Sequence, residues 1–571
     1  MFKQLIHNGV HVIQIPVPDH LELMIRGERR ALTRTQIEMA MAWAKKQGTP
    51  YVEDPTFVSN FMQDFSAELG VDPPLTVEEV DFGPALRIVR TERAAKKRLT
   101  KEERKALAAE RKEEREALKE QYGYAIVNGE RVEIANYAAE PSSIFMGRGK
   151  HPLRGRWKEG PQQSDITLNL SPDAPRPPGE WDEIVWQPES LWVARWRDKL
   201  SEKLKYVWLS DTAPVKQERE EAKFDQAVEL DENLDRVRDY IEQGLRDSDE
   251  KRQMVATACY LIDVLCLRVG DEKDADEADT IGATTLRPEH VTLHPDGTAE
   301  FEFLGKDSVL WHKRIKLPPV VRNNLAELLQ KAQSSNPSHE KSQIFEISSS
   351  DVNAYLSEIL PGLTAKVFRT RHATAAVRDR LLASEVEASD PDHKKWEAVS
   401  LANLEAAILC NHSKTAPARW QERRQRAGER LEKRKERVEQ YRCRLDEAND
   451  VPLALEREAQ EKEDEAETEA QRDRVQARYV KKIERAKKKI ETAENRLRRA
   501  EIALDKAETK EAVAVKKRTW NLGTSLKSYI DPRVLCEWGD QVDYDVLENY
   551  YPKALRRKFA WARGQEQEED E

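Results

Sequence analysis

The spacing of hydrophobic and polar residues changes along the chain, and its first part mixes two patterns. A strand–turn–strand pattern with Asn-Gly at its centre spans 124–134 and predicts a β-hairpin. The run 93–120 is rich in Ala, Glu, Lys and Arg, a composition that favours a helix. We therefore expect residues 1–200 to form a mixed region of short strands and helices.

The hydrophobic pattern over residues 201–416 predicts a second, mainly helical region with one hairpin. The apolar run 254–269 is typical of a buried helix, and we expect Gly270 to cap it. Residues 298–304 alternate, with aromatic side chains on one face and acidic side chains on the other. Residues 309–317 can pair back against them across a short turn.

Residues 417–515 are mostly charged residues and alanine, and they carry two apolar seams with heptad spacing. The seams can bury each other, which predicts an antiparallel coiled-coil arm; the alternative is a solvated linker. We expect 449–452 to begin the reversal, and the pattern leaves open whether 453–475 is helix or disorder. The stronger seam consists of Tyr479, Ile483, Ala486, Ile490, Ala493, Leu497, Ala500, Leu504 and Ala507, and the weaker one, interrupted by Arg434, of Ala427, Leu431, Val438, Tyr441, Leu445 and Ala448.

Charge is segregated along the chain. The net charge of -10 and the pI of about 5.8 argue against a nucleic-acid partner when the chain is taken as a whole. Lysine and arginine nevertheless cluster in 93–119 and 481–499, whereas acidic residues collect in 456–469 and in the tail 566–571. Because DNA binding needs a basic surface rather than a basic total, the composition does not exclude DNA.

The cysteines and the N-terminus indicate an intracellular protein. The five cysteines form no CxxC pair and have no zinc-ligand spacing, and three of them lie in apolar runs as core residues. The first residues do not have the architecture of a signal peptide, and no apolar stretch is long enough to span a membrane. We therefore expect a reducing compartment and no membrane contact.

Three common kinds of phosphate chemistry have no motif in this sequence. It contains no GxxxxGK[ST] loop, no His or Cys cluster with metal-ligand spacing and no carboxylate set typical of a two-metal nuclease. An enzyme of this sequence that acts on phosphates would therefore use cations and a protein nucleophile, without a metal or cofactor. Tyr529, which follows the charged arm, is a candidate nucleophile, although most tyrosines in such positions are packing residues.

Four basic residues could support that nucleophile, but none of them is distinctive alone. Arg268 ends the predicted buried helix, and Lys306 lies at the tip of the predicted hairpin. Arg369 sits in a Lys-Val-Phe-Arg-Thr run, and His412 follows an apolar run. Each residue also has an ordinary interpretation as a helix-end, turn, surface or capping residue, and spacing alone does not bring them together.

The sequence around these residues resembles the type IB DNA topoisomerases, specifically the large eukaryotic-type form. The resemblance covers nearly the whole chain from about residue 90, and its blocks occur in the family's order with the charged arm between His412 and Tyr529. The blocks are residues 122–124, 136–152, 267–273, 278–282, 303–308, 363–370, 407–412, 528–533 and 558–562. They include Leu-Arg-Val-Gly-Asp around Arg268, Leu-Gly-Lys-Asp-Ser around Lys306 and Ser-Tyr-Ile-Asp-Pro-Arg around Tyr529.

The resemblance implies a catalytic role for each of these residues. Tyr529 would attack a backbone phosphorus and form a 3′-phosphotyrosyl link, while Arg268 and Arg369 would hold the non-bridging oxygens. His412 would donate to one of those oxygens, and Lys306 would protonate the leaving 5′-oxygen. Because the link conserves the energy of the phosphodiester bond, relaxation of positive and negative supercoils would need neither ATP nor a metal.

The resemblance also implies an α+β, multidomain architecture. Residues 1–200 would form a DNA-clamping lobe, 201–416 a mainly helical catalytic core like that of tyrosine recombinases, 417–515 a coiled-coil linker, and 516–571 the segment that carries the nucleophile. The protein would be a monomeric clamp around double-stranded DNA, and its binding would be salt-sensitive. The further residues expected to contact DNA are Arg148, Lys150, Lys205, Lys366 and Lys527.

The sequence departs from the family in several places, among them Glu159, Gly160 and Met146, which stand where relatives often carry arginine. Ser528 precedes the nucleophile, where the family often has asparagine, and the long basic N-terminal tail of the nuclear enzymes is absent. We therefore expect a tail-less archaeal or prokaryotic version. It would be cytoplasmic and nucleoid-associated, or nuclear if the source is eukaryotic.

Two other interpretations stay open. A tyrosine recombinase shares the arginine–lysine–histidine–tyrosine chemistry, but it places its tyrosine soon after the last basic residue and has no long arm between them. A non-enzymatic DNA-bridging protein built on the coiled coil would keep every activity after a Tyr529→Phe substitution.

Overall fold

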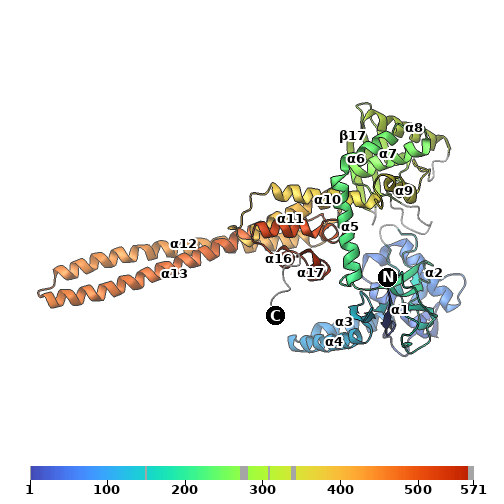
Figure 1. The fold of residues 1–571 in the computed structure, drawn as a ribbon. Coiled ribbons are helices and arrows are strands. Elements are labelled where there is room, and N and C mark those ends of the chain that lie inside the picture. The colour runs from blue at the N-terminus through green and yellow to red at the C-terminus, as the bar shows by residue number, and fades with distance from the viewer. Residues whose placement is uncertain (1, 148–150, 271–280, 306–308, 336–341, 564–571) are drawn as a thin grey trace. The chain divides into compact units, whose positions relative to one another are not determined.

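The computed structural model describes residues 2–147, 151–270, 281–305, 309–335 and 342–563 (Figure 1). The chain divides into two compact units, residues 1–365 and 366–571. The first unit combines helices with small sheets and the second is built from helices, which confirms the expected mixed α and β class. Among the described residues, no helix is long and apolar enough to cross a membrane.

The strands of the first unit form small, separate sheets. They are β1 Leu5–His7, β2 His11–Val12, β3 Glu22–Ile25, β4 Glu28–Ala31, β5 Val80–Asp81, β6 Tyr124–Val127, β7 Glu130–Glu133, β8 Ala138–Ala139, β9 Ser143–Ile144, β10 Trp157–Lys158, β11 Ile166–Asn169, β12 Glu183–Val185, β13 Trp192–Arg197, β14 Leu204–Trp208, β15 Val291–Leu293, β16 Thr298–Gly305 and β17 Val309–Lys316. The largest sheet has the order β12-β11-β13-β14, and the three-stranded sheets are β1-β6-β7, β4-β3-β5 and β15-β16-β17. β2 pairs with β8, and β9 with β10.

Helices cover these sheets and supply much of the core. Trp43 of the first helix stacks on Phe61 of the second, with 4.6 Å between ring centroids, and both side chains are buried. The helices of this unit are α1 Arg34–Lys46, α2 Pro55–Leu69, α3 Gly83–Arg98, α4 Lys101–Tyr122, α5 Pro214–Glu232, α6 Leu234–Gly244, α7 Glu250–Leu265, α8 Pro319–Ser335 and α9 Ser349–Ile359.

The predicted N-terminal elements are present, with one change. β6 and β7 form the expected hairpin, and Asn128 and Gly129 take positive φ angles of 53° and 91°, as a tight two-residue turn requires. The single helix predicted over 93–120 is instead split between α3 and α4. Thr100 starts the second helix because its hydroxyl accepts from the Glu103 amide at 3.2 Å and the Glu103 carboxylate accepts from the Thr100 amide at 2.7 Å.

The predicted buried helix and hairpin of the second region also form. α7 ends earlier than predicted, because Cys266 rather than Gly270 takes the left-handed conformation that terminates it, with φ 53°. β16 and β17 pair as predicted, and part of their turn, 306–308, lies outside the described residues. Phe301 and Phe303 face the core, at 0% and 5% exposure, so the alternating pattern predicted the buried face correctly.

Two long helices, α12 and α13, dominate the second unit and lie side by side (Figure 1). Every residue of both predicted seams is buried or half-buried, whereas Arg434 is exposed. The heptad spacing therefore marks the stripe along which these helices pack. The helices of this unit are α10 Ala365–Leu382, α11 Asp392–Leu409, α12 Trp420–Asp464, α13 Glu469–Lys516, α14 Leu522–Ser528, α15 Pro532–Gln541, α16 Val546–Asn549 and α17 Lys553–Lys558.

The long helices are joined later in the chain than predicted, so the reversal expected at 449–452 is wrong. α12 continues through that stretch, and the chain turns over 465–468, where the Thr468 hydroxyl caps α13 by accepting from the Gln471 amide at 3.3 Å. Pro452 lies inside α12 and is buried. A proline here removes one backbone hydrogen bond, but its position continues the apolar seam, so the packing on α13 is kept.

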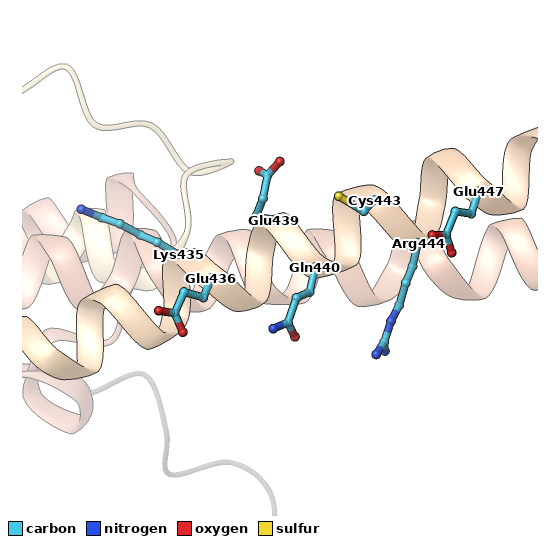
Figure 2. Close-up of a pocket in the computed structure, with 7 residues that line it drawn as sticks. All are labelled: Lys435, Glu436, Glu439, Gln440, Cys443, Arg444 and Glu447. Atoms are coloured by element: carbon cyan, nitrogen blue, oxygen red, sulfur yellow. The ribbon is translucent and has the colours of Figure 1, made fainter.

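Side-chain contacts show that α12 and α13 run antiparallel. The Tyr479 hydroxyl donates to Glu458 at 2.7 Å, whereas Arg442, nearer the start of α12, lies 3.6 Å from Glu501, nearer the end of α13. Figure 2 shows a pocket on α12, and it contains none of the predicted site residues. Its lining side chains, all from this one helix, are Lys435, Glu436, Glu439, Gln440, Cys443, Arg444 and Glu447.

Candidate active site

The start of α12 and the end of α13 are joined where the helical pair meets the rest of the second unit. Ser413, before α12, and Trp520, after α13, form an antiparallel β-bridge. The Asn521 amide donates to the His412 carbonyl at 2.7 Å. The segments before and after the helical pair are therefore adjacent in space, although the whole pair separates them in sequence.

The end of α11 fixes the position of His412. Asn411 takes a left-handed conformation with φ 51°, which asparagine tolerates better than most residues. Its amide donates to the Ile408 carbonyl at 3.0 Å, and the His412 amide donates to the Ala407 carbonyl at 2.8 Å. This pair of bonds is a Schellman motif, and it aims the chain out of the helix at the histidine.

Tyr529 stands at the end of α14 and is held from α10. Its amide donates to the Ser525 carbonyl at 2.9 Å, and its own carbonyl accepts from the Thr374 hydroxyl at 3.2 Å. The same hydroxyl oxygen accepts from the Asp531 amide at 3.1 Å. Thr374 therefore fixes the backbone that immediately follows the tyrosine ring.

Arg369, His412 and Tyr529 meet in the second unit. The guanidinium carbon of Arg369 lies 5.0 Å from the centroid of the Tyr529 ring, and the His412 ring centroid lies 5.3 Å from it. The three residues are 3%, 7% and 6% exposed, respectively. Within the described part of the chain, no protein group forms a hydrogen bond with the Tyr529 hydroxyl, which leaves that oxygen available as a nucleophile.

Hydrogen bonds orient the two groups beside the tyrosine. Arg369 donates through Nη2 to the Cys410 carbonyl at 3.0 Å, and His412 Nδ1 lies 3.1 Å from the Ser525 hydroxyl. When that hydroxyl donates to Nδ1, the proton of the neutral imidazole is on Nε2, which is then a donor. A guanidinium and an imidazole N–H that lie against a tyrosine ring can stabilise negative charge on a phosphoryl group bound there.

Arg268 belongs to the first unit, in the segment that follows α7. The Arg268 carbonyl accepts from the Ala283 amide at 2.8 Å. Gly270 and Gly282 cross so closely that a Cβ built on Gly282 would lie 2.5 Å from the Gly270 Cα, so neither glycine admits a side chain. This contact fixes the backbone next to a half-buried arginine.

The other predicted site residues are spread over both units. Lys205 is half-buried on β14, and Lys366 and Lys527 are exposed on α10 and α14. Lys527 lies two positions before Tyr529 in sequence. Its carbonyl accepts a hydrogen bond from the buried Lys558 ammonium at 3.2 Å. Predicted residues that lie outside the described part are Arg148, Lys150 and Lys306.

Sequence reasoning missed the residues that position the site. Ser525 holds the histidine ring, Thr374 holds the tyrosine backbone, and Asn411 provides the turn before the histidine. Two of them left a local signal: Ser525 lies one helical turn before Tyr529, and Asn411 follows an apolar helix as a capping residue. Thr374 left no such signal, because its contact with Tyr529 depends on the tertiary packing of α10.

Three lysines, Lys414, Lys510 and Lys517, lie close together where α12 and α13 meet the rest of the second unit. The Lys517 ammonium lies 5.0 Å, and that of Lys510 6.0 Å, from the ring centroid of Trp396. Burial, and then the charges of Lys414 and Lys510, lower the pKa of Lys517. In the described part of the chain, no acidic side chain forms an ion pair with any of the three lysines, so this is a positively charged patch.

Comparisons with known proteins point to one family. The chain matches the family models of eukaryotic DNA topoisomerase I: the DNA-binding fragment over residues 1–209, the catalytic core over 212–445 and the C-terminal topoisomerase domain over 501–570. It is 33% identical over 567 residues to DNA topoisomerase 1 alpha of Arabidopsis thaliana. That match covers 98% of this chain and 58% of the Arabidopsis protein.

Two mitochondrial relatives match over most of their own length. The chain is 31% identical over 576 residues to DNA topoisomerase I, mitochondrial, of Pan troglodytes, and 30% identical over 576 residues to the Homo sapiens protein of the same name. Each match covers 98% of this chain and 90% of the relative, whereas the chain spans 58% of the length of both Arabidopsis relatives. The chain belongs to the eukaryotic DNA topoisomerase I family.

Proposed function

We propose that this protein is a type IB DNA topoisomerase that relaxes positive and negative supercoils without ATP. The observation that carries the proposal is the meeting of Arg369, His412 and Tyr529 in the second unit of a chain that belongs to this family. A buried cation and an imidazole that flank a tyrosine ring match the needs of an attack on a phosphodiester by that tyrosine.

In the proposed reaction, the Tyr529 oxygen attacks a backbone phosphorus, and a 3′-phosphotyrosyl ester forms as the bond to the 5′-oxygen breaks. Lys306, which lies outside the described residues, gives a proton to the leaving 5′-oxygen. Arg268 and Arg369 hold the non-bridging oxygens, and His412 donates to one of them. After rotation, the 5′-hydroxyl attacks the ester and releases the tyrosine. Each step exchanges one phosphate ester for another, so religation needs no ATP.

The proposed partner is double-stranded DNA, bound by a single chain. Residues 1–200 act as a DNA-clamping lobe, 201–416 as the catalytic core, 417–515 as a coiled-coil linker and 516–571 as the segment that delivers the nucleophile. The protein is therefore DNA-associated in the cell. Lys205, Lys366 and Lys527 contact phosphates, which position a protein on a duplex without reading its sequence.

The lysine patch formed by Lys414, Lys510 and Lys517 supports a contact between DNA and the base of the arm. Ammonium groups that share a patch without acidic partners repel one another, and a phosphate relieves that repulsion. An arm held to the duplex in this way would slow rotation of the cut strand.

A plasmid relaxation assay tests the proposal. The protein is incubated with negatively and positively supercoiled plasmid in EDTA without ATP, and relaxation of both is expected. Tyr529→Phe should abolish relaxation, whereas Tyr441→Phe, which alters a half-buried tyrosine on α12, should keep it. A requirement for ATP or magnesium, or a fully active Tyr529→Phe variant, would overturn the proposal.

The same assay separates the other interpretations. A tyrosine recombinase would join two specific sites rather than relax any plasmid, and the family membership does not favour it. A DNA-bridging protein would keep every activity in the Tyr529→Phe variant.

A further inference from the structure

The exposed face of the β16–β17 hairpin gathers carboxylates and histidines. Glu300 and Glu302 lie two positions apart on β16, so their side chains leave the same face, and Glu302 is paired directly with His312 of β17. One possible ligand atom from each of these three residues lies within 4.8 Å of the other two. The opposite face of the same strand carries buried phenylalanines, so the exposed face is free to serve another purpose.

A second histidine joins this cluster from the segment after β15. His294 Nε2 lies 3.0 Å from one oxygen of Glu300, and His312 Nε2 lies 2.6 Å from the other oxygen. Two imidazoles therefore flank a single carboxylate. This arrangement orients Glu300 by way of neighbouring side chains, as partners of metal ligands usually do.

The cluster has no strong cation of its own. Arg314 is paired with Glu300 in the strand register, but it donates instead to Asp296 at 2.7 Å and to Thr298 at 2.9 Å. Throughout the described ranges, no lysine or arginine forms an ion pair with Glu300 or Glu302. Two carboxylates balanced only by imidazoles form an electron-rich site that a divalent cation would neutralise.

We propose that Glu300, Glu302 and His312 bind a Zn²⁺ ion, with His294 orienting Glu300. Imidazole nitrogen together with carboxylate oxygen favours zinc and similar transition metals, whereas magnesium and calcium prefer oxygen alone. Tetrahedral zinc places its ligand atoms about 3.3 Å apart, so side-chain rotation alone can close this cluster. The ion links β16 to β17 without entering the proposed DNA chemistry, and it goes beyond that function.

Calorimetric titration of the full chain with ZnCl₂, after removal of metals with a chelator, tests this site. We expect saturable binding of about one ion per chain, weakened about tenfold or more by His312→Ala and by Glu302→Gln. His20→Ala is the matched control, because His20 is an exposed histidine 3.3 Å from Glu22, outside the cluster. Cys443→Ser tests whether the exposed thiol of Cys443 contributes to zinc binding. This variant should bind zinc as tightly as the parent chain does.

A second readout guards against a trivial loss of binding. Zinc should raise the thermal unfolding temperature of the parent chain but not that of His312→Ala, while both keep the same far-UV circular dichroism without metal. Both side chains are exposed, so the substitutions should leave the fold intact. Absence of saturable zinc binding in the parent chain, or parent-like affinity in both His312→Ala and Glu302→Gln, would overturn the proposal.

Discussion

A guanidinium and an imidazole flank the Tyr529 ring, and each is held by its own hydrogen bond. Arg369 is bound to the Cys410 carbonyl and His412 to the Ser525 hydroxyl, so neither group has to be ordered when a substrate arrives. Preorganised donors of this kind lower the free energy of a charged transition state because they cost no reorganisation.

Arg369→Lys tests whether the guanidinium geometry matters. A lysine keeps the charge but loses the planar fork, so it cannot hold the Cys410 carbonyl and a phosphate oxygen in the same way. We expect single-turnover cleavage to slow by about 10²–10³-fold, with little change in DNA affinity. Arg371→Lys, two positions further along α10, is the control. Equal effects of the two substitutions on cleavage would contradict the assigned role.

His7 should make the first unit sensitive to acid. The Gly9 amide donates to His7 Nδ1 at 3.0 Å and Nε2 lies 3.0 Å from the Asn169 carbonyl, which fixes a neutral ring, and burial lowers the pKa of His7 to about 4. Because the unfolded chain takes up this proton first, stability is lost as pH falls from about 6.5 towards 4, by about 2 kcal/mol between pH 7 and pH 5.

Thermal unfolding at pH 7 and pH 5 measures that loss. His7→Gln keeps a donor for Asn169 but cannot be protonated, so its unfolding temperature should fall less between the two pH values than that of the parent chain. His20→Gln, at an exposed site, should behave like the parent. An identical pH dependence in all three proteins would exclude His7 as the source.

At the scale of elements, periodic hydrophobic patterns predicted the buried faces correctly, whereas the points where helices begin and end were predicted poorly. The seam along α13 and the alternation along β16 each marked the buried face, because burial repeats with the period of the element. The proline at 452 suggested a turn, but α12 continues through it because its contacts with α13 continue. The division of the predicted helix into α3 and α4 was missed. The composition favours helix throughout this stretch, but the capping box at Thr100 starts a new helix.

The arrangement of the candidate site was beyond prediction from spacing. His412 and Tyr529 are brought together by the bridge between Ser413 and Trp520, and that bridge depends on α12 and α13 having matching lengths. Sequence alone identified these residues through family resemblance, whereas the role of Thr374 emerged only from the packing of α10 against the tyrosine.

Ala486→Glu tests the seam between the long helices. Ala486 is 5% exposed, so a glutamate there buries a charge and should destabilise the helical pair by roughly 1–3 kcal/mol. Limited trypsin digestion should therefore cut α12 and α13 faster in this variant than in the parent chain. Ala477→Glu, at an exposed position of the same helix, should not change the rate appreciably. Equal digestion of the two variants would contradict the packing.

At the scale of the whole molecule, the proposed partner is a polyanion, whereas the protein itself is acidic. The net charge of -10 opposes DNA at long range, so the proposed binding would depend on local basic patches such as that of Lys414, Lys510 and Lys517. Salt dependence is the direct measure of how many phosphates such patches neutralise.

Lys517→Gln should reduce that salt dependence. If its ammonium contacts one phosphate, the slope of log affinity against log salt should fall by about 0.9. Lys331→Gln removes a lysine that is bound to Glu250 at 2.9 Å in the first unit, and it should leave the slope unchanged. An unchanged slope for Lys517→Gln would show that this lysine, at the base of the helical pair, does not contact a DNA phosphate.

The proposed mechanism requires a reversible covalent bond between Tyr529 and one DNA strand, and that bond can be trapped. The protein is mixed with duplex DNA in EDTA, denatured rapidly with detergent, digested with trypsin and analysed by mass spectrometry. We expect a peptide containing Tyr529 esterified to a 3′-phosphate, with a free 5′-hydroxyl on the other end of the break. A 5′-phosphate link, a link to another residue or no covalent adduct would contradict the proposed mechanism.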